Sequence, residues 1–199
     1  ALKETHIKRR LAWSTVGNLA YIMFSISIMT PLGLAGALSH MLFHAVMKIC
    51  SFFCAGSVIY VTGKEYINEL DGLGRKMPRI FFMLAVASFG LMGVPGLCGF
   101  ISKWEIVKAS IETPNALSVT GVAALLISSL LTTVYMMTMA VRAFFPGKDF
   151  DYSTVSKYKD PGWMMIVPLA IFTVLIIYFG VNSGWLIRTL EQIAYAAVG

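Results

Sequence analysis

Residues 93–103 read Gly-Val-Pro-Gly-Leu-Cys-Gly-Phe-Ile-Ser-Lys, and this stretch decides the fold of the chain. It interrupts an apolar run, Ile80–Glu112, that is otherwise long enough to cross a lipid bilayer. Proline cannot donate a backbone hydrogen bond and glycine weakens a helix interior, so Pro95, Gly96 and Gly99 predict a break. Backbone groups freed inside lipid cost several kcal/mol each unless protein or water satisfies them. The stretch predicts a discontinuous transmembrane helix, typical of ion sites in transporters, although a kink that only helps packing is the alternative.

The composition agrees with a membrane protein. Of the 199 residues, 57% are hydrophobic and 13% are charged, against roughly 25% charged residues in an average soluble domain. The mean hydropathy is +0.75, and the apolar residues run in blocks near the ~20 residues that cross a bilayer. The net charge is +6, but the chain has no basic face that could lie along phosphates, so the sequence predicts no nucleic-acid partner. It predicts contact with the lipid bilayer instead.

The chain contains five hydrophobic units, one of them interrupted. The predicted fold class is therefore all-α, a polytopic membrane protein of about five transmembrane helices with one discontinuous helix. Proline at Pro31 ends the first unit. The five units and a short amphipathic tail cover about Leu11–Met29, Leu34–Thr62, Ile80–Glu112, Leu117–Val141, Trp163–Asn182 and Trp185–Ala197.

Loop charges predict the orientation, because Lys and Arg favour the cytoplasmic side of a membrane. Twelve of the sixteen cations fall on one side, whereas the other side holds only Lys108 and Arg188. We therefore expect a multi-pass protein of the cytoplasmic membrane, with a cytoplasmic N-terminal end and a tail outside. The twelve cations are Lys3, Lys8, Arg9, Arg10, Lys64, Arg75, Lys76, Arg79, Arg142, Lys148, Lys157 and Lys159.

Lys103 follows the break and lies near the middle of the predicted bilayer. A lysine at that depth costs ~2.5–3.5 kcal/mol on insertion scales. Desolvation favours the neutral amine, so a lysine there can accept and release a proton. We expect helix hydrogen bonding to lapse between about Val94 and Ser102, with Lys103 facing the protein interior. The alternative is that the second half-helix begins late and Lys103 reaches water with its long stem.

His40, His44 and Lys48 are spaced four residues apart and form a row along one face of the second unit. Titratable rows are typical of proton relays, in which hydrogen bonds and waters link the groups. The alternative for each histidine is a satisfied core residue. A metal would need further ligands, which no carboxylate or usable thiol supplies, so no metal site is predicted.

Weaker polar positions would line a hydrated path or simply contact a neighbouring helix. They are Asn18, Ser14 and Ser102 and, more ambiguously, Ser128, Ser129, Thr132 and Thr133. The sequence contains no Gly-rich phosphate loop, flavin fingerprint, cysteine cluster or serine nucleophile motif. It therefore predicts no cofactor and no catalytic centre within the chain.

Several segments resemble the antiporter-like subunits of respiratory complex I. Residues 7–18 resemble the "KR-L-AYSS-S" segment of that family, and residues 44–57 resemble its "HA-xx-K … AG" helix. Residues 93–104 resemble its broken helix, "G-P-P … GF-x-(S/G)K". The linker at 69–78 is most similar to the D-type subunits of Mrp sodium/proton antiporters and of membrane-bound hydrogenases. The resemblance covers roughly residues 5–145.

The resemblance implies about fourteen transmembrane helices in which two inverted five-helix repeats each contain a broken helix. This chain, a single transmembrane domain over 1–199, would supply the last five helices. Residues 11–145 would form the second repeat without its first helix, 146–182 the closing helix and 183–199 the amphipathic tail. The chain begins with Ala1 rather than Met, so we expect it to be part of a longer chain.

The resemblance also implies roles for individual residues. Lys103 corresponds to the broken-helix lysine of the family, and His44 and Lys48 correspond to the preceding relay helix. Asn18 stands where some subunits have histidine, so that position can hold a water but cannot titrate.

We therefore interpret the chain as the C-terminal proton-channel half of an antiporter-like subunit, with a hydrated path through His40, His44, Lys48 and Lys103. The ion would be a proton, with sodium as the alternative. The partners would be other membrane subunits of a redox-driven pump, of the NADH-quinone oxidoreductase or hydrogenase type, that hold the electron-transfer chemistry. Two alternatives stay open: a subunit of an Mrp-type antiporter, and a structural subunit whose buried lysines pair with a neighbour's carboxylates.

Overall fold

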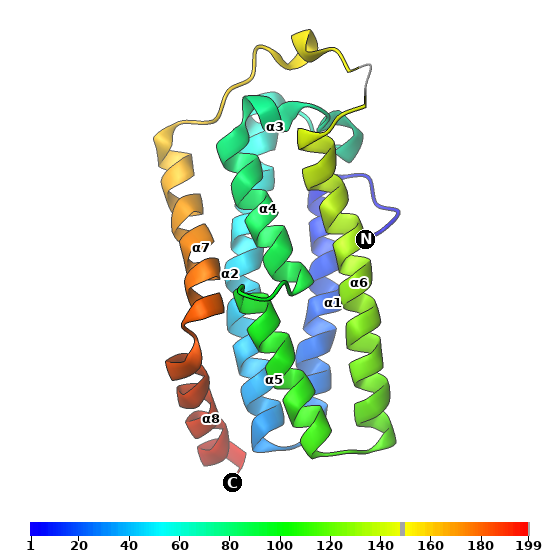
Figure 1. Cartoon of the computed structure of the whole chain (residues 1–199), viewed down its shortest axis with the longest axis vertical. Coiled ribbons are helices and arrows are strands. Elements are labelled where there is room, and N and C mark those ends of the chain that lie inside the picture. Colours follow the sequence, from blue (N-terminus) through cyan, green and yellow to red (C-terminus); the bar gives the residue numbers. More distant parts are fainter. Residues whose placement is uncertain (148–149, 199) are drawn as a thin grey trace.

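The chain folds, in the computed structural model, into a bundle of helices along one long axis (Figure 1). The structure describes residues 1–147 and 150–198, so the cation at Lys148 lies outside the described residues. The predicted all-α class is confirmed, since the described part of the chain holds no strand beyond an isolated bridge between His6 and Tyr66. The elements are α1 (Ile7–Ser27), α2 (Pro31–Thr62), η1 (Ile67–Glu69), α3 (Leu73–Lys76), α4 (Pro78–Met92), α5 (Cys98–Glu112), α6 (Ala116–Phe144), η2 (Tyr152–Val155), α7 (Trp163–Val181) and α8 (Gly184–Val198).

The helix α2 lies at the centre of the bundle and contacts α1, α4, α5, α7 and α8. Thr30 caps its start, because the hydroxyl accepts a hydrogen bond from the Gly33 N–H at 3.1 Å. Pro31 occupies the first turn, where a helix needs no N–H donor. Gly63 ends the helix in the left-handed conformation, at φ 71°. The 32 residues extend over ~48 Å, well beyond the ~30 Å hydrocarbon core of a bilayer.

The half-helices α4 and α5 follow one another along the bundle axis, with residues 93–97 between them (Figure 1). By length and composition, α2, α6 and α7 are apolar enough to span a membrane, and α4 is a shorter apolar helix. The helix α1 begins with Lys8, Arg9 and Arg10, which lower its mean hydropathy, but it runs beside α2 through the bundle. The five predicted units are thus α1, α2, the α4–α5 pair, α6 and α7.

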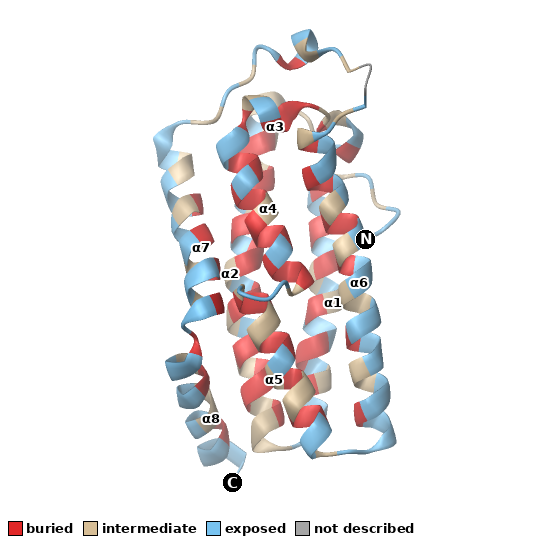
Figure 2. Cartoon of the chain, in the orientation of Figure 1, coloured by how far each residue is buried: buried red, intermediate tan, exposed pale blue. Residues whose placement is uncertain are grey.

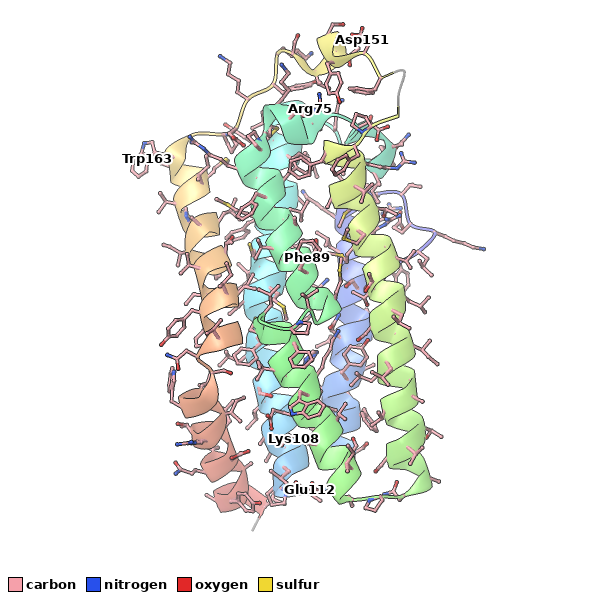
Figure 3. All side chains as sticks on the ribbon, viewed as in Figure 1. Arg75, Phe89, Lys108, Glu112, Asp151 and Trp163 are labelled. Carbon is pink, nitrogen blue, oxygen red and sulfur yellow. The ribbon has the colours of Figure 1, made fainter. Side chains whose placement is uncertain are left out.

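Charged side chains gather near the two ends of the bundle. Figure 3 shows Arg75 and Asp151 at one end and Glu112 toward the other, with Phe89 between them. Burial separates the inner helices from the outer ones. The helices α2, α4 and α5 hold much of the buried surface, whereas the outward faces of α6, α7 and α8 are exposed (Figure 2). Leu130 on α6, for example, is 69% exposed. This arrangement suits a membrane protein whose outer helices face lipid.

Residues 150–162, which precede α7, cross one end of the bundle (Figure 1). The Asp160 carboxylate accepts hydrogen bonds at 3.4 Å from the N–H groups of Arg79 and Ile80 in the first turn of α4. A carboxylate at that position satisfies free N–H groups and complements the positive end of the helix. The crossing segment therefore holds the outer end of α4.

The amphipathic tail forms the helix α8, which packs against α2. Its inner face buries Ile187 and Ala194. Only Asn182 and Ser183 separate it from α7, so the fifth unit and the tail together make a second interrupted helix (Figure 1).

Candidate functional site

Glycine and proline build the break between α4 and α5. The φ angles of Gly93 and Gly96 are 92° and 88°, in the left-handed region that favours glycine. A Cβ atom on Gly93 would also lie 3.2 Å from Cδ of Lys103. Regular helix resumes at Cys98, so the break covers residues 93–97 and is shorter than the sequence predicts.

Gly99 requires a correction, because it lies in the first turn of α5 and not in the break. A Cβ atom at Gly99 would collide with the carbonyl oxygen of Gly90. Glycine is needed there because the two half-helices approach closely, as small residues allow at membrane helix contacts. Ser102 also lies within α5, one full turn after the helix begins.

Lys103 reaches from α5 back to the end of α4. The residue is 7% exposed, and Nζ donates hydrogen bonds to the carbonyls of Leu91 at 2.9 Å and Met92 at 3.0 Å. Nζ also donates to the Ser129 hydroxyl of α6 at 2.8 Å. The last carbonyls of a helix lack intrahelical partners and carry partial negative charge, so the amine satisfies groups that the break has freed. Within the described ranges, no carboxylate forms an ion pair with it.

The row on α2 is buried along its whole length. His40, His44 and Lys48 are 0%, 6% and 6% exposed. The two imidazole rings stack with their centroids 5.9 Å apart, and His40 Nδ1 lies 2.9 Å from the Ser102 hydroxyl of α5. Ser102 directly precedes Lys103 in α5, so this contact joins the row to the broken helix. At the other end, Lys48 Nζ donates to the Leu11 carbonyl of α1 at 2.9 Å.

Four buried polar atoms near the row have no hydrogen-bond partner among the described residues. They are Nε2 of His40, Nε2 of His44, Oδ1 of Asn18 and Oγ of Ser14. Asn18 and Ser14 both lie on α1, where the Asn18 amide donates to the Ser14 carbonyl at 2.8 Å. Buried polar groups are rarely left unpaired, and ordered water satisfies most of those without a protein partner. The site therefore has the polar atoms that internal waters require.

Tyr21 of α1 was missed by the sequence analysis. Its ring meets the His40 ring edge-to-face at a centroid distance of 5.6 Å, and Lys103 Nζ lies 5.7 Å from its centroid. A lysine over an aromatic face is stabilised by the ring quadrupole. Tyr21 follows Asn18 by three residues and so shares its helix face, which was the available signal.

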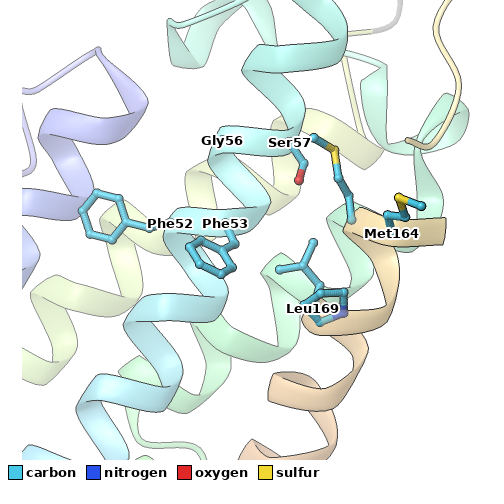
Figure 4. A pocket seen from close by; sticks show the side chains of 8 residues that line it. Phe52, Phe53, Gly56, Ser57, Met164 and Leu169 are labelled. Atoms are coloured by element: carbon cyan, nitrogen blue, oxygen red, sulfur yellow. The ribbon is translucent and has the colours of Figure 1, made fainter. Parts of the chain in front are cut away.

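Two further features, possible metal ligands and an apolar surface groove, were compared with the site. No group of three His, Cys, Asp or Glu residues close enough to hold a metal occurs in the described ranges. A groove of about 340 Å³ lies between α2 and α7, lined by residues such as Phe52, Phe53, Gly56 and Leu169 (Figure 4). It contains no titratable side chain, so it is separate from the row.

The bundle contains helices long and apolar enough to cross a membrane, and one helical unit is interrupted beside a buried amine, so the class is that of polytopic membrane proteins with a discontinuous helix. The family follows from comparison with known proteins. The family model described as "NADH:quinone oxidoreductase/Mrp antiporter, TM" matches residues 1–132, and the chain belongs to this family. The resemblance carried by the sequence motifs is thereby confirmed.

Individual relatives agree with the family. Subunit N of the NADH-quinone oxidoreductase of Desulforudis audaxviator is 30% identical over 203 residues, covering 98% of this chain and 40% of that protein. A chain of an archaeal membrane-bound sulfane sulfur reductase is 32% identical with a TM-score of 0.82, covering 94% of this chain and 30% of that one. A chain of Thermus thermophilus respiratory complex I shares the fold at 22% identity, with a TM-score of 0.84, covering 99% and 40%. The present chain therefore spans about two fifths or less of the length of these relatives.

Proposed function

We propose that this chain forms the proton-translocating part of an antiporter-like membrane subunit, with Lys103 as the group that takes up and releases the proton. The observation that carries the proposal is the position of the Lys103 amine. It is buried at mid-depth, and it is bonded to two freed carbonyls and one hydroxyl rather than to a carboxylate of this chain. A carboxylate partner would hold the charge in place, whereas neutral oxygens let the proton leave.

Hydrogen-bond contacts support the proposed path next to Lys103. His40 contacts the hydroxyl of Ser102, the residue directly before Lys103, and the His44 ring stacks on the His40 ring. The Nε2 atoms of both histidines have no hydrogen-bond partner among the described residues. Waters bound to these atoms would carry the proton from one ring to the other, since the rings stack and form no direct hydrogen bond. Lys48 would close the path at the α1 side, where Nζ bonds the Leu11 carbonyl. Asn18, Ser14 and Ser102 would hold waters without titrating.

The relatives support membership in a redox-driven complex. The named matches near 30% identity are subunits of oxidoreductases and of a respiratory reductase complex. The chain would then pump protons while other subunits transfer electrons, so it would need no cofactor of its own. Because the family description also names Mrp antiporters, a subunit of such an antiporter, with sodium as a second ion, is the alternative.

The orientation is also proposed, on the loop charges alone. We propose that the end that holds the 63–79 loop and the described part of the 142–161 loop faces the cytoplasm and that α8 lies toward the outer side. Single cysteines placed in these two loops, in a protein lacking its three native cysteines, should react with an impermeant thiol reagent only from the inside. Reaction from outside would reverse the orientation.

Lys103→Gln is the variant that tests the proton path. Glutamine keeps an N–H donor for one of the freed carbonyls but cannot titrate, so we expect the complex to assemble and proton flux in vesicles to be lost. Lys103→Glu should retain part of the flux, because a titratable group remains. Lys108→Ala is the matched control, since Lys108 lies on the same helix, is partly exposed and pairs with Glu105 at 2.9 Å. Normal flux in Lys103→Gln would refute the proposed mechanism.

The structural alternative makes the opposite prediction. If Lys103 paired with a carboxylate on a neighbouring subunit, its removal would leave a buried charge alone at a cost of ~3–5 kcal/mol. Lys103→Gln would then reduce the yield of the assembled complex, and flux per complex would stay normal. Yield and flux measured on the same preparation separate the two functions.

A further inference from the structure

The apolar groove between α2 and α7 lies apart from the proposed proton path. Its volume of about 340 Å³ falls within the ~300–1,000 Å³ of ordinary ligand pockets. Phenylalanine, methionine, proline and leucine side chains form its walls, and Ser57 is the only lining residue with a polar side chain (Figure 4). The groove therefore suits a hydrocarbon chain rather than a polar ligand.

The groove lies near one end of both helices, the end that holds the 63–79 loop. On α2 it ends at Ser57, five residues before the last residue of the helix, or ~7.5 Å at 1.5 Å per residue. On α7 it begins at Met164, the second residue of the helix. A hydrocarbon chain that fills the groove would thus enter it from the nearby membrane surface.

Two exposed aromatic side chains flank the groove at this end. Tyr60 lies one turn beyond Gly56 on the same face of α2 and is 76% exposed. Trp163 is the first residue of α7, is 70% exposed and points away from the bundle (Figure 3). Tyrosine and tryptophan are enriched where the hydrocarbon core meets the lipid headgroups. The two residues therefore mark the headgroup level beside the groove.

Two lysines lie beyond the aromatic residues. The segment before α7 is joined to the end of α2, because the Tyr158 hydroxyl donates to the Thr62 carbonyl at 3.4 Å. The amines of Lys64 and Lys157 lie 5.6 Å and 5.1 Å from the centroid of the Tyr158 ring. A lysine amine is a compact charge on a flexible stem, so both amines can turn toward a single phosphate.

The carboxylates near these lysines are bound elsewhere. Asp160 accepts hydrogen bonds from the first turn of α4, and Glu69 accepts them from two backbone N–H groups of its own loop. Within the described ranges, neither Lys64 nor Lys157 forms an ion pair with a carboxylate. The headgroup level beside the groove is therefore positively charged and complements an anion.

We propose that the groove binds one anionic phospholipid, with an acyl chain between α2 and α7 and the phosphate at Lys64 and Lys157. Basic pockets between transmembrane helices bind anionic lipid headgroups in this way. The Ser57 hydroxyl lies at the level between chain and phosphate, where it can donate to an ester carbonyl of the lipid. The site is independent of the proposed proton path, because it contains none of the residues of that path.

The first experiment identifies the occupant by photo-crosslinking. The photoreactive residue p-benzoylphenylalanine replaces Phe53, which lines the groove, in the full-length subunit within its complex. The vesicles contain phosphatidylcholine as the major lipid and phosphatidylglycerol with the same acyl chains as the minor one. The same replacement at Phe82 of α4, which is 60% exposed, reports the surrounding lipid.

We expect phospholipid adducts at position 53 in which phosphatidylglycerol is enriched about tenfold over its share of the vesicle. Adducts at position 82 should follow the vesicle composition. Peptide adducts at position 53, from another segment or subunit, would assign the groove to protein and overturn the proposal. Lipid adducts in the vesicle ratio, or no adducts, would overturn it as well.

Charge removal tests the headgroup contact. The double variant Lys64→Gln/Lys157→Gln should lose the enrichment at position 53, because only the charges distinguish the two lipids. Lys8→Gln/Arg9→Gln is the matched control, since it removes the same charge from exposed residues at the same end of the bundle, at the start of α1. Enrichment that persists in the Lys64→Gln/Lys157→Gln variant would overturn the site.

The second experiment needs no crosslinker. Phosphatidylglycerol added to the detergent-extracted complex should raise its melting temperature, because a ligand that binds the folded state stabilises it, whereas phosphatidylcholine should not. A Cβ atom at Gly56 would meet nothing within 4 Å, so Gly56→Leu fills the groove without a backbone clash and should abolish the rise. Gly184→Leu, at the equally open start of α8, is the control. An unchanged rise in Gly56→Leu would overturn the proposal. If Gly56→Leu lowers the yield of complex, the Lys64→Gln/Lys157→Gln variant decides, and an unchanged rise there has the same meaning.

Discussion

Two helical units along the bundle are interrupted, and the two interruptions are satisfied in different ways. Between α4 and α5, the freed carbonyls of Leu91 and Met92 are bound by the amine of Lys103, which comes from the other half-helix. Between α7 and α8, the Asn182 N–H donates to the Tyr178 carbonyl at 2.7 Å, and its side chain donates to the Tyr178 hydroxyl at 3.2 Å. A side chain from the other half-helix bridges the first interruption, whereas the bonds of Asn182 at the second stay within the last turn of α7.

The difference shows that a broken helix alone does not define an ion site. Asn182 is exposed at its interruption, whereas Lys103 is buried at its own. The two interruptions also touch, because a Cβ atom at Gly180 in α7 would collide with the backbone of Gly96 and Leu97. Close backbone packing is common to both interruptions, and the titratable side chain of Lys103 distinguishes the interruption between α4 and α5.

The largest effect is expected from Gly99→Val at the first interruption. Its new side chain would collide with the Gly90 carbonyl and crowd Met47 Sδ, so the half-helices could not pack, at a cost of ~3 kcal/mol or more. We expect almost no folded protein after detergent extraction and size-exclusion chromatography. Gly184→Ala at the start of α8 is the control, because a Cβ atom there has open space. Normal yield of Gly99→Val would show that close packing of α4 on α5 is not required.

An intermediate effect is expected from the loss of the amine. Lys103→Ala leaves the Leu91 and Met92 carbonyls without a donor, and each buried unpaired group costs ~1–3 kcal/mol. Lys103→Gln can donate to one of them, so it should lower the melting temperature less than Lys103→Ala does. Thermal unfolding of both variants in the same detergent provides the measurement. Equal melting temperatures would mean that water replaces the amine at no cost.

The smallest effect is expected at the second interruption. Asn182→Ala removes only the exposed side-chain bond to Tyr178 and keeps the backbone bond, so the free energy of unfolding should change by ~0.5 kcal/mol or less. The same thermal assay tests it, with Tyr178→Phe as the matched change on the other partner. A loss as large as that of Lys103→Ala would remove the distinction between the two interruptions.

Local sequence features were sufficient to predict the five long units and the tail, but not the short helices η1, α3 and η2. The effect of a proline or glycine is local, as at Pro31 and in the Gly93–Gly96 run. The apolar blocks are continuous in sequence, so both signals can be read without a structure. The partners of Lys103 could not be predicted in the same way. Nζ bonds carbonyls eleven and twelve residues back across a break whose geometry depends on two left-handed glycines.

Packing between helices set the remaining limits. His40 contacts Ser102 across 62 residues of sequence, and this pairing depends on how α2 lies against α5. Tyr21 was overlooked because a tyrosine in an apolar helix is ordinarily a packing residue, and only the position of α1 places its ring between His40 and Lys103. Gly99 was assigned to the break because its need for close approach to Gly90 has no signal within α5 itself.

The depth of Lys103 has an electrical consequence. The amine donates a hydrogen bond to Leu91 at the end of α4. The junction of α4 and α5 lies near the middle of the bundle (Figure 1), and the labelled charged residues lie toward its two ends (Figure 3). One elementary charge that crosses the whole membrane at 100 mV changes its energy by ~2.3 kcal/mol, so a proton carried only to mid-depth experiences roughly half of that. Each 100 mV would change the ratio of protonated to neutral amine by roughly sevenfold, since 1.36 kcal/mol corresponds to a factor of ten. The membrane voltage would thereby act directly on how often this lysine carries a proton.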